Sequence, residues 1–79
     1  MLDELKTAEK VVGIKQLLKA LSAGRVKKVF IAADADPMLT GPLAAQCQEA
    51  NITVVSAATM RQLGEACEIS VAAAVAAIV

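Results

Sequence analysis

Three polar side chains at the start of a short amphipathic segment suit the recognition of a ligand that carries phosphate. Lys15 and Lys19 are cations one helical turn apart, and the amide of Gln16 lies between them in the sequence. The first N–H groups of a helix have no partner within it, so a helix start already favours an anion. The lysines add charge, and the amide can both donate and accept. An ordinary solvated helix face is the alternative that these residues leave open.

Residues 13–24 must form a helix if these side chains are to act together. Four aliphatic residues recur there at the spacing of one helix face, which predicts that this face lies in the core. They are Ile14, Leu17, Leu18 and Leu21. Gly13 allows a tight turn before the helix, and Gly24 stands where a glycine often ends one. The opposite face, with the lysines, is then left for solvent or a ligand.

The carboxylates of Asp34 and Asp36 follow the strongest predicted strand, residues 29–33. Active sites and metal sites often lie at such a strand end, so a small hydrolase or a metal-binding protein is one hypothesis. A role in turns and helix caps explains both carboxylates with fewer assumptions. Asp36 can cap a helix that has Pro37 at its first position. We therefore expect structure rather than chemistry from this pair.

The composition describes a small aliphatic protein. The chain has 79 residues, is 57% hydrophobic and has Phe30 as its only aromatic residue, so it has no aromatic platform on which a run of bases could stack. Eight basic and eight acidic residues cancel, so net charge argues neither for nor against nucleic acid. There is no histidine, and Cys47 and Cys67 are far apart, so zinc and redox sites have little support. Two buried, free thiols are expected.

The sequence predicts one soluble cytoplasmic domain over residues 1–79. The first five residues, Met-Leu-Asp-Glu-Leu, are acidic and amphipathic, unlike a signal peptide. The last apolar run, residues 71–79, is much shorter than the ~20 residues that span a bilayer. No membrane partner, small-molecule substrate, metal or cofactor is expected.

Helical and strand patterns alternate along the chain. Helices are expected over residues 2–10, 14–23 and 60–67, the last capped by Thr59, and over a stretch from Pro37 that either restarts near Thr40 or enters with a kink at Gly41-Pro42. Strands are expected at residues 11–12, 29–33, 52–55 and 75–79, the last after a short alanine-rich turn of helix. This alternation predicts an α/β fold, a three-layer α/β/α sandwich.

Other cations could extend a binding surface. Arg25, Lys27 and Lys28 would do so if the end of the central helix faces the same side as its start, or they could solubilise the approach to an edge strand. Arg61 is open to the same two interpretations.

The loop around Ile69 and Val71 is apolar. Its two aliphatic side chains are expected to fill the core by default. If exposed beside the cationic helix start, they would instead form a shelf for an unstacked base.

Three blocks of sequence resemble the kink-turn RNA-binding ribosomal-protein family, above all its small stand-alone bacterial members. They are Gly13-Ile-Lys-Gln-Leu-Leu-Lys19, Val29-Phe-Ile-Ala-Ala-Asp-Ala-Asp-Pro37 and Leu63-Gly-Glu-Ala-Cys-Glu-Ile-Ser-Val-Ala-Ala-Ala74. The blocks stand in the right order and spacing, and the similarity covers essentially the whole chain. It implies an α/β/α sandwich around a four-stranded mixed sheet and a protein that is not an enzyme.

The resemblance also implies a ligand, namely ribosomal or regulatory RNA that bends sharply where sheared G·A pairs flank a short bulge. Lys15, Gln16 and Lys19 would touch the G·A edges and nearby phosphates, and the loop at residues 68–72 would cover an unpaired base. The expected RNA-binding residues are Gly13, Lys15, Gln16, Lys19, Lys28, Arg61, Glu68, Ile69, Ser70, Val71 and Ala72.

Two residues depart from the family pattern. Gln16 stands where many members have glutamate, which keeps the reach but adds donors. Glu68 stands where glycine is usual, which places a carboxylate beside the RNA and strains a turn that favours positive φ. We expect weaker RNA affinity as a result. The balanced charge and Glu68 also permit an alternative, a protein–protein interaction module on the same fold that has lost RNA binding.

Overall fold

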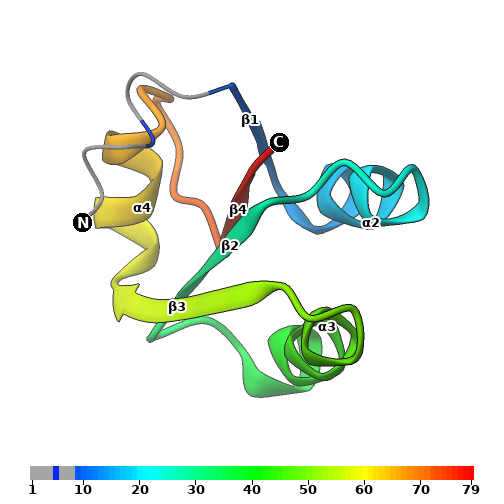
Figure 1. The fold of residues 1–79 in the computed structure, drawn as a ribbon. Helices are drawn as coiled ribbons and strands as arrows, with labels where there is room; N and C mark the ends of the chain where they lie inside the picture. Colours follow the sequence, from blue (N-terminus) through cyan, green and yellow to red (C-terminus); the bar gives the residue numbers. More distant parts are fainter. Residues whose placement is uncertain (1–4, 6–8) are drawn as a thin grey trace.

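The computed structural model describes residue 5 and residues 9–79, which form one mixed sheet with helices packed on both of its faces (Figure 1). In chain order the elements are β1 (Lys10–Val12), α2 (Ile14–Ser22), β2 (Lys28–Ala32), α3 (Pro37–Glu49), β3 (Thr53–Ala58), α4 (Met60–Ala66) and β4 (Val75–Ile78). The predicted α/β/α sandwich is confirmed. The helix predicted over residues 2–10 lies largely outside the described residues, and its last residue, Lys10, instead begins β1.

The sheet has the strand order β1-β4-β2-β3, in which β4 runs antiparallel to both neighbours and β3 runs parallel to β2. As a consequence β1, β2 and β3 all end at one edge of the sheet, where β4 begins. The pairing of Val12 with Ala76 and of Ile31 with Val75 sets this register. We call this edge the C-terminal edge. Helices α2, α3 and α4 all follow strands that end there.

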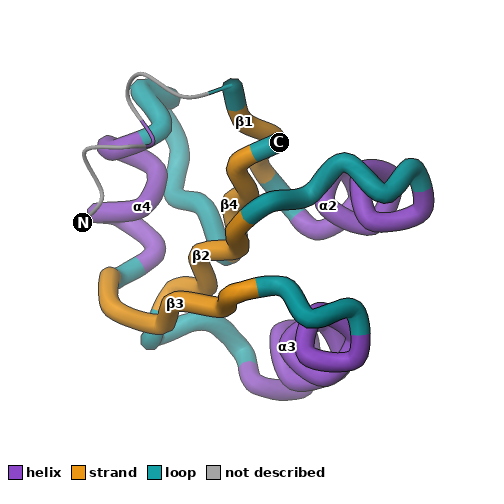
Figure 2. The backbone as a smooth tube through the Cα atoms, in the orientation of Figure 1, coloured by secondary structure: helices purple, strands orange, loops and turns teal. Residues whose placement is uncertain are grey.

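Helix α4 covers one face of the sheet, and α2 and α3 cover the other (Figure 2). Each face buries its own hydrophobic cluster. Alternate residues of β2 point to opposite faces, as the pleat requires. Phe30 packs with Leu63 and Cys67 of α4 on one face. Val29 packs with residues of α2 and α3 on the other, among them Leu17 and Cys47. Strand β2 is therefore covered on both sides, as its continuous apolar run predicts.

Helix α2 packs through a face centred on Leu17, which has no exposed surface, with Ile14 and Leu21 half-buried on its flank. The prediction that Leu18 lies in the core is wrong, because 39% of Leu18 is exposed. Successive residues of a helix advance by about 100°, so Leu18 lies a quarter turn or more from the buried centre. Ala20 is buried instead, on the other side of Leu17.

Helix α3 is a single helix that includes Pro42, so the predicted restart near Thr40 is wrong. A proline inside a helix leaves the carbonyl four residues earlier without its usual donor. That carbonyl belongs to Met38 in the first turn, where 84% of the residue is exposed and water can satisfy it. Strand β3 also runs from Thr53 to Ala58, later and longer than the predicted residues 52–55.

Residues 71–74 are not helical, so the predicted alanine-rich turn of helix before β4 is wrong. Their backbone groups bond to other elements instead. Ala73 N–H donates to the carbonyl of Met60 at 3.0 Å, and Ala32 N–H donates to the carbonyl of Ala74 at 2.9 Å. These bonds between elements replace the local ones that a helix would make.

The carboxylates of Asp34 and Asp36 have the structural role that the sequence predicts. Asp36 Oδ1 accepts the N–H of Met38 at 2.9 Å and caps α3. Asp34 Oδ1 accepts the N–H of Met60 at 2.7 Å, which joins the end of β2 to the first turn of α4. A carboxylate at a helix start also interacts favourably with the helix dipole.

Replacement of Asp34 by alanine should lower the free energy of unfolding by about 1–2 kcal/mol, because the N–H of Met60 loses a charged acceptor. Asp34→Asn keeps a neutral acceptor of the same size and should lose less. Urea denaturation of the two variants beside the wild type measures both effects. An unchanged midpoint for Asp34→Ala would show that the bond contributes nothing in solution.

Candidate nucleic-acid interface

The start of α2 is fixed at the C-terminal edge of the sheet by Gly13. This residue has φ +96° and ψ 156°, a conformation that is essentially restricted to glycine. Its N–H donates to the carbonyl of Val75 at 3.0 Å, so the turn before α2 lies against the first residue of β4. No described side chain caps α2, and its first turn has no acidic residue. The first N–H groups of the helix therefore remain available to an anion.

Lys15, Gln16 and Lys19 are all exposed. Their exposure follows from the burial of Leu17, because steps of about 100° place both lysines on the side of α2 opposite that leucine. Gln16 lies on one flank of the same exposed surface. The helix thus presents Lys15 and Gln16 beside its uncapped start, and Lys19 one turn further along the same exposed side, in the last turn.

The charge of this neutral chain is unevenly distributed. Between Glu9 and Asp34 the sequence has six basic residues and no acidic one: Lys10, Lys15, Lys19, Arg25, Lys27 and Lys28. This stretch contains α2 and the turns on either side of it. Local positive potential can therefore attract a polyanion even though the total charge is zero. Charge summed over the whole chain hides this signal, whereas charge read along the sequence reveals it.

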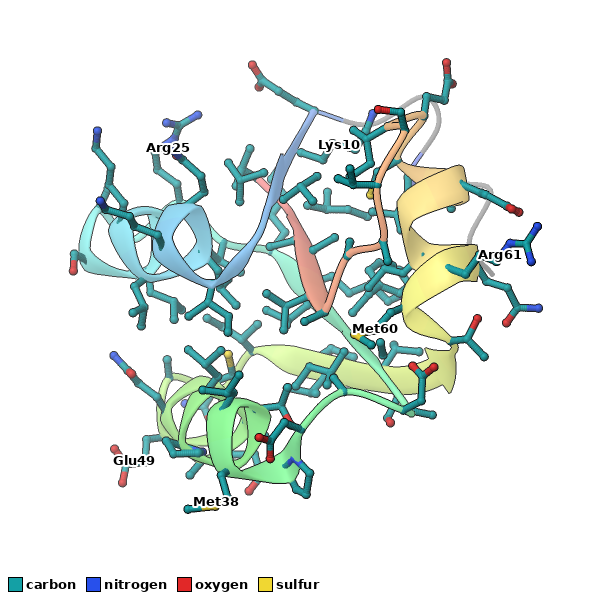
Figure 3. All side chains as sticks on the ribbon, turned by 180° about the vertical axis from the view of Figure 1, so that it is seen from behind. Lys10, Arg25, Met38, Glu49, Met60 and Arg61 are labelled. Carbon is teal, nitrogen blue, oxygen red and sulfur yellow. The ribbon has the colours of Figure 1, made fainter. Side chains whose placement is uncertain are left out.

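Lys28 and Arg61 do not lie at the start of α2. Lys28 begins β2 at the opposite edge of the sheet, with Nζ 5.4 Å from the centre of the Phe30 ring. Arg61 is in the first turn of α4, on the other face of the sheet, and pairs with Glu65 at 3.4 Å. Figure 3 shows Arg25, which follows α2, and Arg61 on opposite sides of the molecule. The structure therefore separates Lys28 and Arg61 from Lys15 and Lys19.

The segment at residues 67–74, which we call the α4–β4 loop, runs back along α4 towards the C-terminal edge (Figure 3). Ile69 N–H donates to the carbonyl of Gly64 at 3.1 Å near the end of the helix. Ala73 N–H bonds to Met60 near the start of the helix, as described above. The last residues of the loop thus reach the edge where Gly13 lies.

The apolar loop residues divide between the two predicted roles. Ile69 is half-buried and packs against the core on the α4 side of the sheet. In contrast, 67% of Val71 is exposed. A concavity of about 270 Å³ lies between the loop and α4, lined by Arg61, Glu65, Ile69, Ser70, Val71 and Ala72. The loop therefore has both a half-buried anchor, Ile69, and an exposed apolar side chain, Val71, that can meet a ligand.

Glu68 lies at the end of α4 that is distant from the C-terminal edge and adopts the left-handed conformation, with φ +61°. Helices α2, α3 and α4 all end in this way, and the left-handed residue is Gly24, Asn51 and Glu68 in turn. At the end of α4, Glu68 N–H bonds to the carbonyl of Glu65 at 3.0 Å and Ile69 N–H bonds to that of Gly64, which is the Schellman pattern. The positive φ predicted for this position is confirmed.

Replacement of Glu68 by glycine should raise the free energy of unfolding by about 1 kcal/mol. Relief of a left-handed side chain yields about 1–2 kcal/mol, and the greater freedom of glycine in the unfolded chain offsets part of it. Asn51→Gly is the matched control, because asparagine tolerates this conformation and should gain less. Urea denaturation compares the two variants. A loss of stability in Glu68→Gly would contradict the claim that the left-handed conformation strains Glu68.

Cys47 and Cys67 are buried free thiols, as predicted. Burial raises the pKa of both thiols, and for Cys67 the nearby charge of Lys10 opposes that rise. Both groups are therefore neutral near pH 7 and poor nucleophiles. Within residues 5 and 9–79, no group of three or more histidine, cysteine or acidic residues is arranged to hold a metal ion. Nor does any described helix have the length and apolarity to cross a membrane.

Comparison with known proteins identifies the family. Residues 2–79 match the ribosomal protein L7Ae/L30e/S12e/Gadd45 family. The chain is 40% identical over 75 residues to an RNA-binding protein of Geobacillus sp. strain WCH70, which covers 95% of this chain and 92% of that one. It is 39% identical over 74 residues to RNA-binding protein YbxF of Geobacillus stearothermophilus, with 94% and 90% of the two chains covered.

A solved structure of an RNA-binding protein is also similar to this chain. The Giardia lamblia 15.5kD RNA binding protein matches with a TM-score of 0.87 at 32% identity, over 98% of this chain and 68% of that one. The family resemblance of the three sequence blocks is confirmed. The chain belongs to the ribosomal protein L7Ae/L30e/S12e/Gadd45 family.

Proposed function

We propose that this chain is a non-enzymatic RNA-binding protein that recognises and stabilises kink-turn RNA. One observation carries the proposal: Lys15, Gln16 and Lys19 are exposed on one side of α2, and a backbone hydrogen bond from Gly13 holds the uncapped start of this helix beside the end of the α4–β4 loop. The names of the related proteins support RNA as the ligand. The unpaired thiols suit a reducing cytoplasm, where the partner is a ribosomal or regulatory RNA.

The mechanism is a shift of population. A sharply bent RNA is a minor conformer until a protein binds it better than the extended form, and the difference in binding free energy sets the shift. Lys15 and Lys19 contribute a salt-dependent attraction to phosphates that the bend brings together. Gln16 can hydrogen-bond to base edges, and the exposed part of Val71 can cover an unstacked base. The protein thus selects shape with a few polar and apolar contacts on a cationic helix.

Titration with two matched RNAs tests the proposal. One RNA contains a kink-turn, and the other has the same length and charge but Watson-Crick pairs in place of the sheared G·A pairs. We expect the kink-turn RNA to bind at least about tenfold more tightly, which corresponds to about 1.4 kcal/mol. Equal affinities would remove the specific recognition. No binding of either RNA at low salt would favour the protein–protein interaction module instead.

A further inference from the structure

Gly64 lies on the buried side of α4, where the α4–β4 loop passes directly over the helix. A Cβ atom at this position would collide with the carbonyl oxygen of Val71 and would lie 3.2 Å from the Cα of Ala72. Both of those atoms belong to the backbone, so no side-chain rotation relieves the overlap. The carbonyl of Gly64 also accepts the N–H of Ile69 at 3.1 Å. The close approach of the loop to α4 therefore depends on the side chain that residue 64 lacks.

The rest of the loop transmits this placement to the start of α2. Three backbone hydrogen bonds join the segment just after Val71 to three elements: α4, β2 and the turn before α2. They run from the N–H groups of Ala73, Ala32 and Gly13 to the carbonyls of Met60, Ala74 and Val75, at 3.0, 2.9 and 3.0 Å respectively. A displacement of the backbone at Val71 must therefore move this bonded segment or break one of its bonds.

We propose that Gly64 is a positioning residue for RNA recognition. It is buried and does not touch the RNA; it sets the distance between the exposed Val71 and the start of α2, which together must fit one bent RNA. This role rests on the proposed function. It goes beyond it by assigning part of the shape selection to a helix on the opposite face of the sheet from the lysines.

The variant Gly64→Ala tests the proposal. Affinity for kink-turn RNA should fall by roughly tenfold, while the slope of log affinity against log salt stays as in the wild type, because Lys15 and Lys19 are intact. Backbone amide NMR without RNA should show displaced signals for residues 71–75. The number of RNA-competent molecules, found by stoichiometric titration, should not change.

Gly41→Ala is the matched control. It makes the same substitution within a helix, but nothing lies within 4 Å of the added Cβ, and α3 does not contact the loop through this residue. Whatever it does to stability, its affinity for kink-turn RNA should equal that of the wild type. If Gly64→Ala does not fold, the comparison is made in the Glu68→Gly background, which is expected to be more stable.

The outcomes are distinct. Folded Gly64→Ala that binds kink-turn RNA as tightly as the wild type overturns the positioning role and leaves the proposed function intact. Unchanged amide signals at residues 71–75 overturn it too, because the loop would then tolerate the added methyl group. A wild type that does not prefer kink-turn RNA removes the proposed function, and the positioning role with it.

Discussion

Replacement of Lys15 and Lys19 together by alanine should weaken binding to kink-turn RNA by roughly tenfold to a hundredfold. Charge-assisted hydrogen bonds contribute about 1.5–3 kcal/mol each at most, and phosphates can partly rearrange towards other cations. The slope of log affinity against log salt should fall by up to about 2, since each phosphate contact contributes roughly 0.7–0.9. Thermal stability should hardly change, because both side chains are exposed.

The control removes the same charge from the turn that follows α2. Arg25 and Lys27 are exposed in the turn that leads to β2, away from the C-terminal edge. Their joint replacement by alanine lowers the net charge equally, so it reports on general attraction alone. We expect a smaller loss of affinity and little loss of discrimination between the two RNAs. Equal losses in both double variants would mean that RNA binds the whole cationic stretch without a preferred site.

Leu17→Ala should lower the free energy of unfolding by about 2–5 kcal/mol, the largest effect on stability that we expect from one substitution in α2. Leu17 has no exposed surface and packs among Val29, Leu43, Cys47 and Val75 between the helix and the sheet. The free energy of unfolding of a small domain is itself small, so this variant should be partly unfolded near physiological temperature. Its loss of RNA binding would then follow from loss of the fold.

Leu18→Ala is the matched comparison, because it deletes the same atoms from the next position of the same helix. With 39% of Leu18 exposed, the cost should stay under about 1 kcal/mol. Urea denaturation of the pair tests which side of α2 is buried. A larger loss for Leu18→Ala than for Leu17→Ala would mean that the helix is rotated, which would also turn Lys15 and Lys19 away from the surface assigned to them.

The amphipathic pattern was sufficient to predict α2 and the exposure of its lysines, but it did not locate the centre of the buried face. Four aliphatic residues define a stripe, and Leu17 is its middle only if small residues such as Ala20 are also allowed to face the sheet. Alanine favours a helix but, being small, adds little to the pattern of large aliphatic residues that marks a buried face. Contact with the sheet buries it, since a small side chain lets the helix lie close.

Bonds between distant parts of the chain account for most of what the sequence did not predict. A structural role for Asp34 was predicted, but its partner, the N–H of Met60, lies 26 residues further along. Residues 71–74 read as helical because alanine favours helices, whereas their backbone bonds go to Met60 and Ala32.

The positions of Lys28 and Arg61 depend on the strand order. Sequence order alone does not say that β4 lies between β1 and β2, nor which face of the sheet α4 covers. The positive φ of Glu68 could be predicted only because the family has glycine there. The local sequence was thus sufficient to predict the cationic helix, whereas the strand order determines which other residues lie beside it.

Backbone amide NMR during titration with kink-turn RNA tests the central claim most directly. If the exposed side of α2 and the end of the α4–β4 loop hold the RNA, the largest shifts should occur at residues 13–19 and 71–75. Signals of residues 24–28 and of Asn51 should change little. Large shifts at residues 24–28 with none at residues 13–16 would contradict the account, because RNA would then bind the opposite end of the helix.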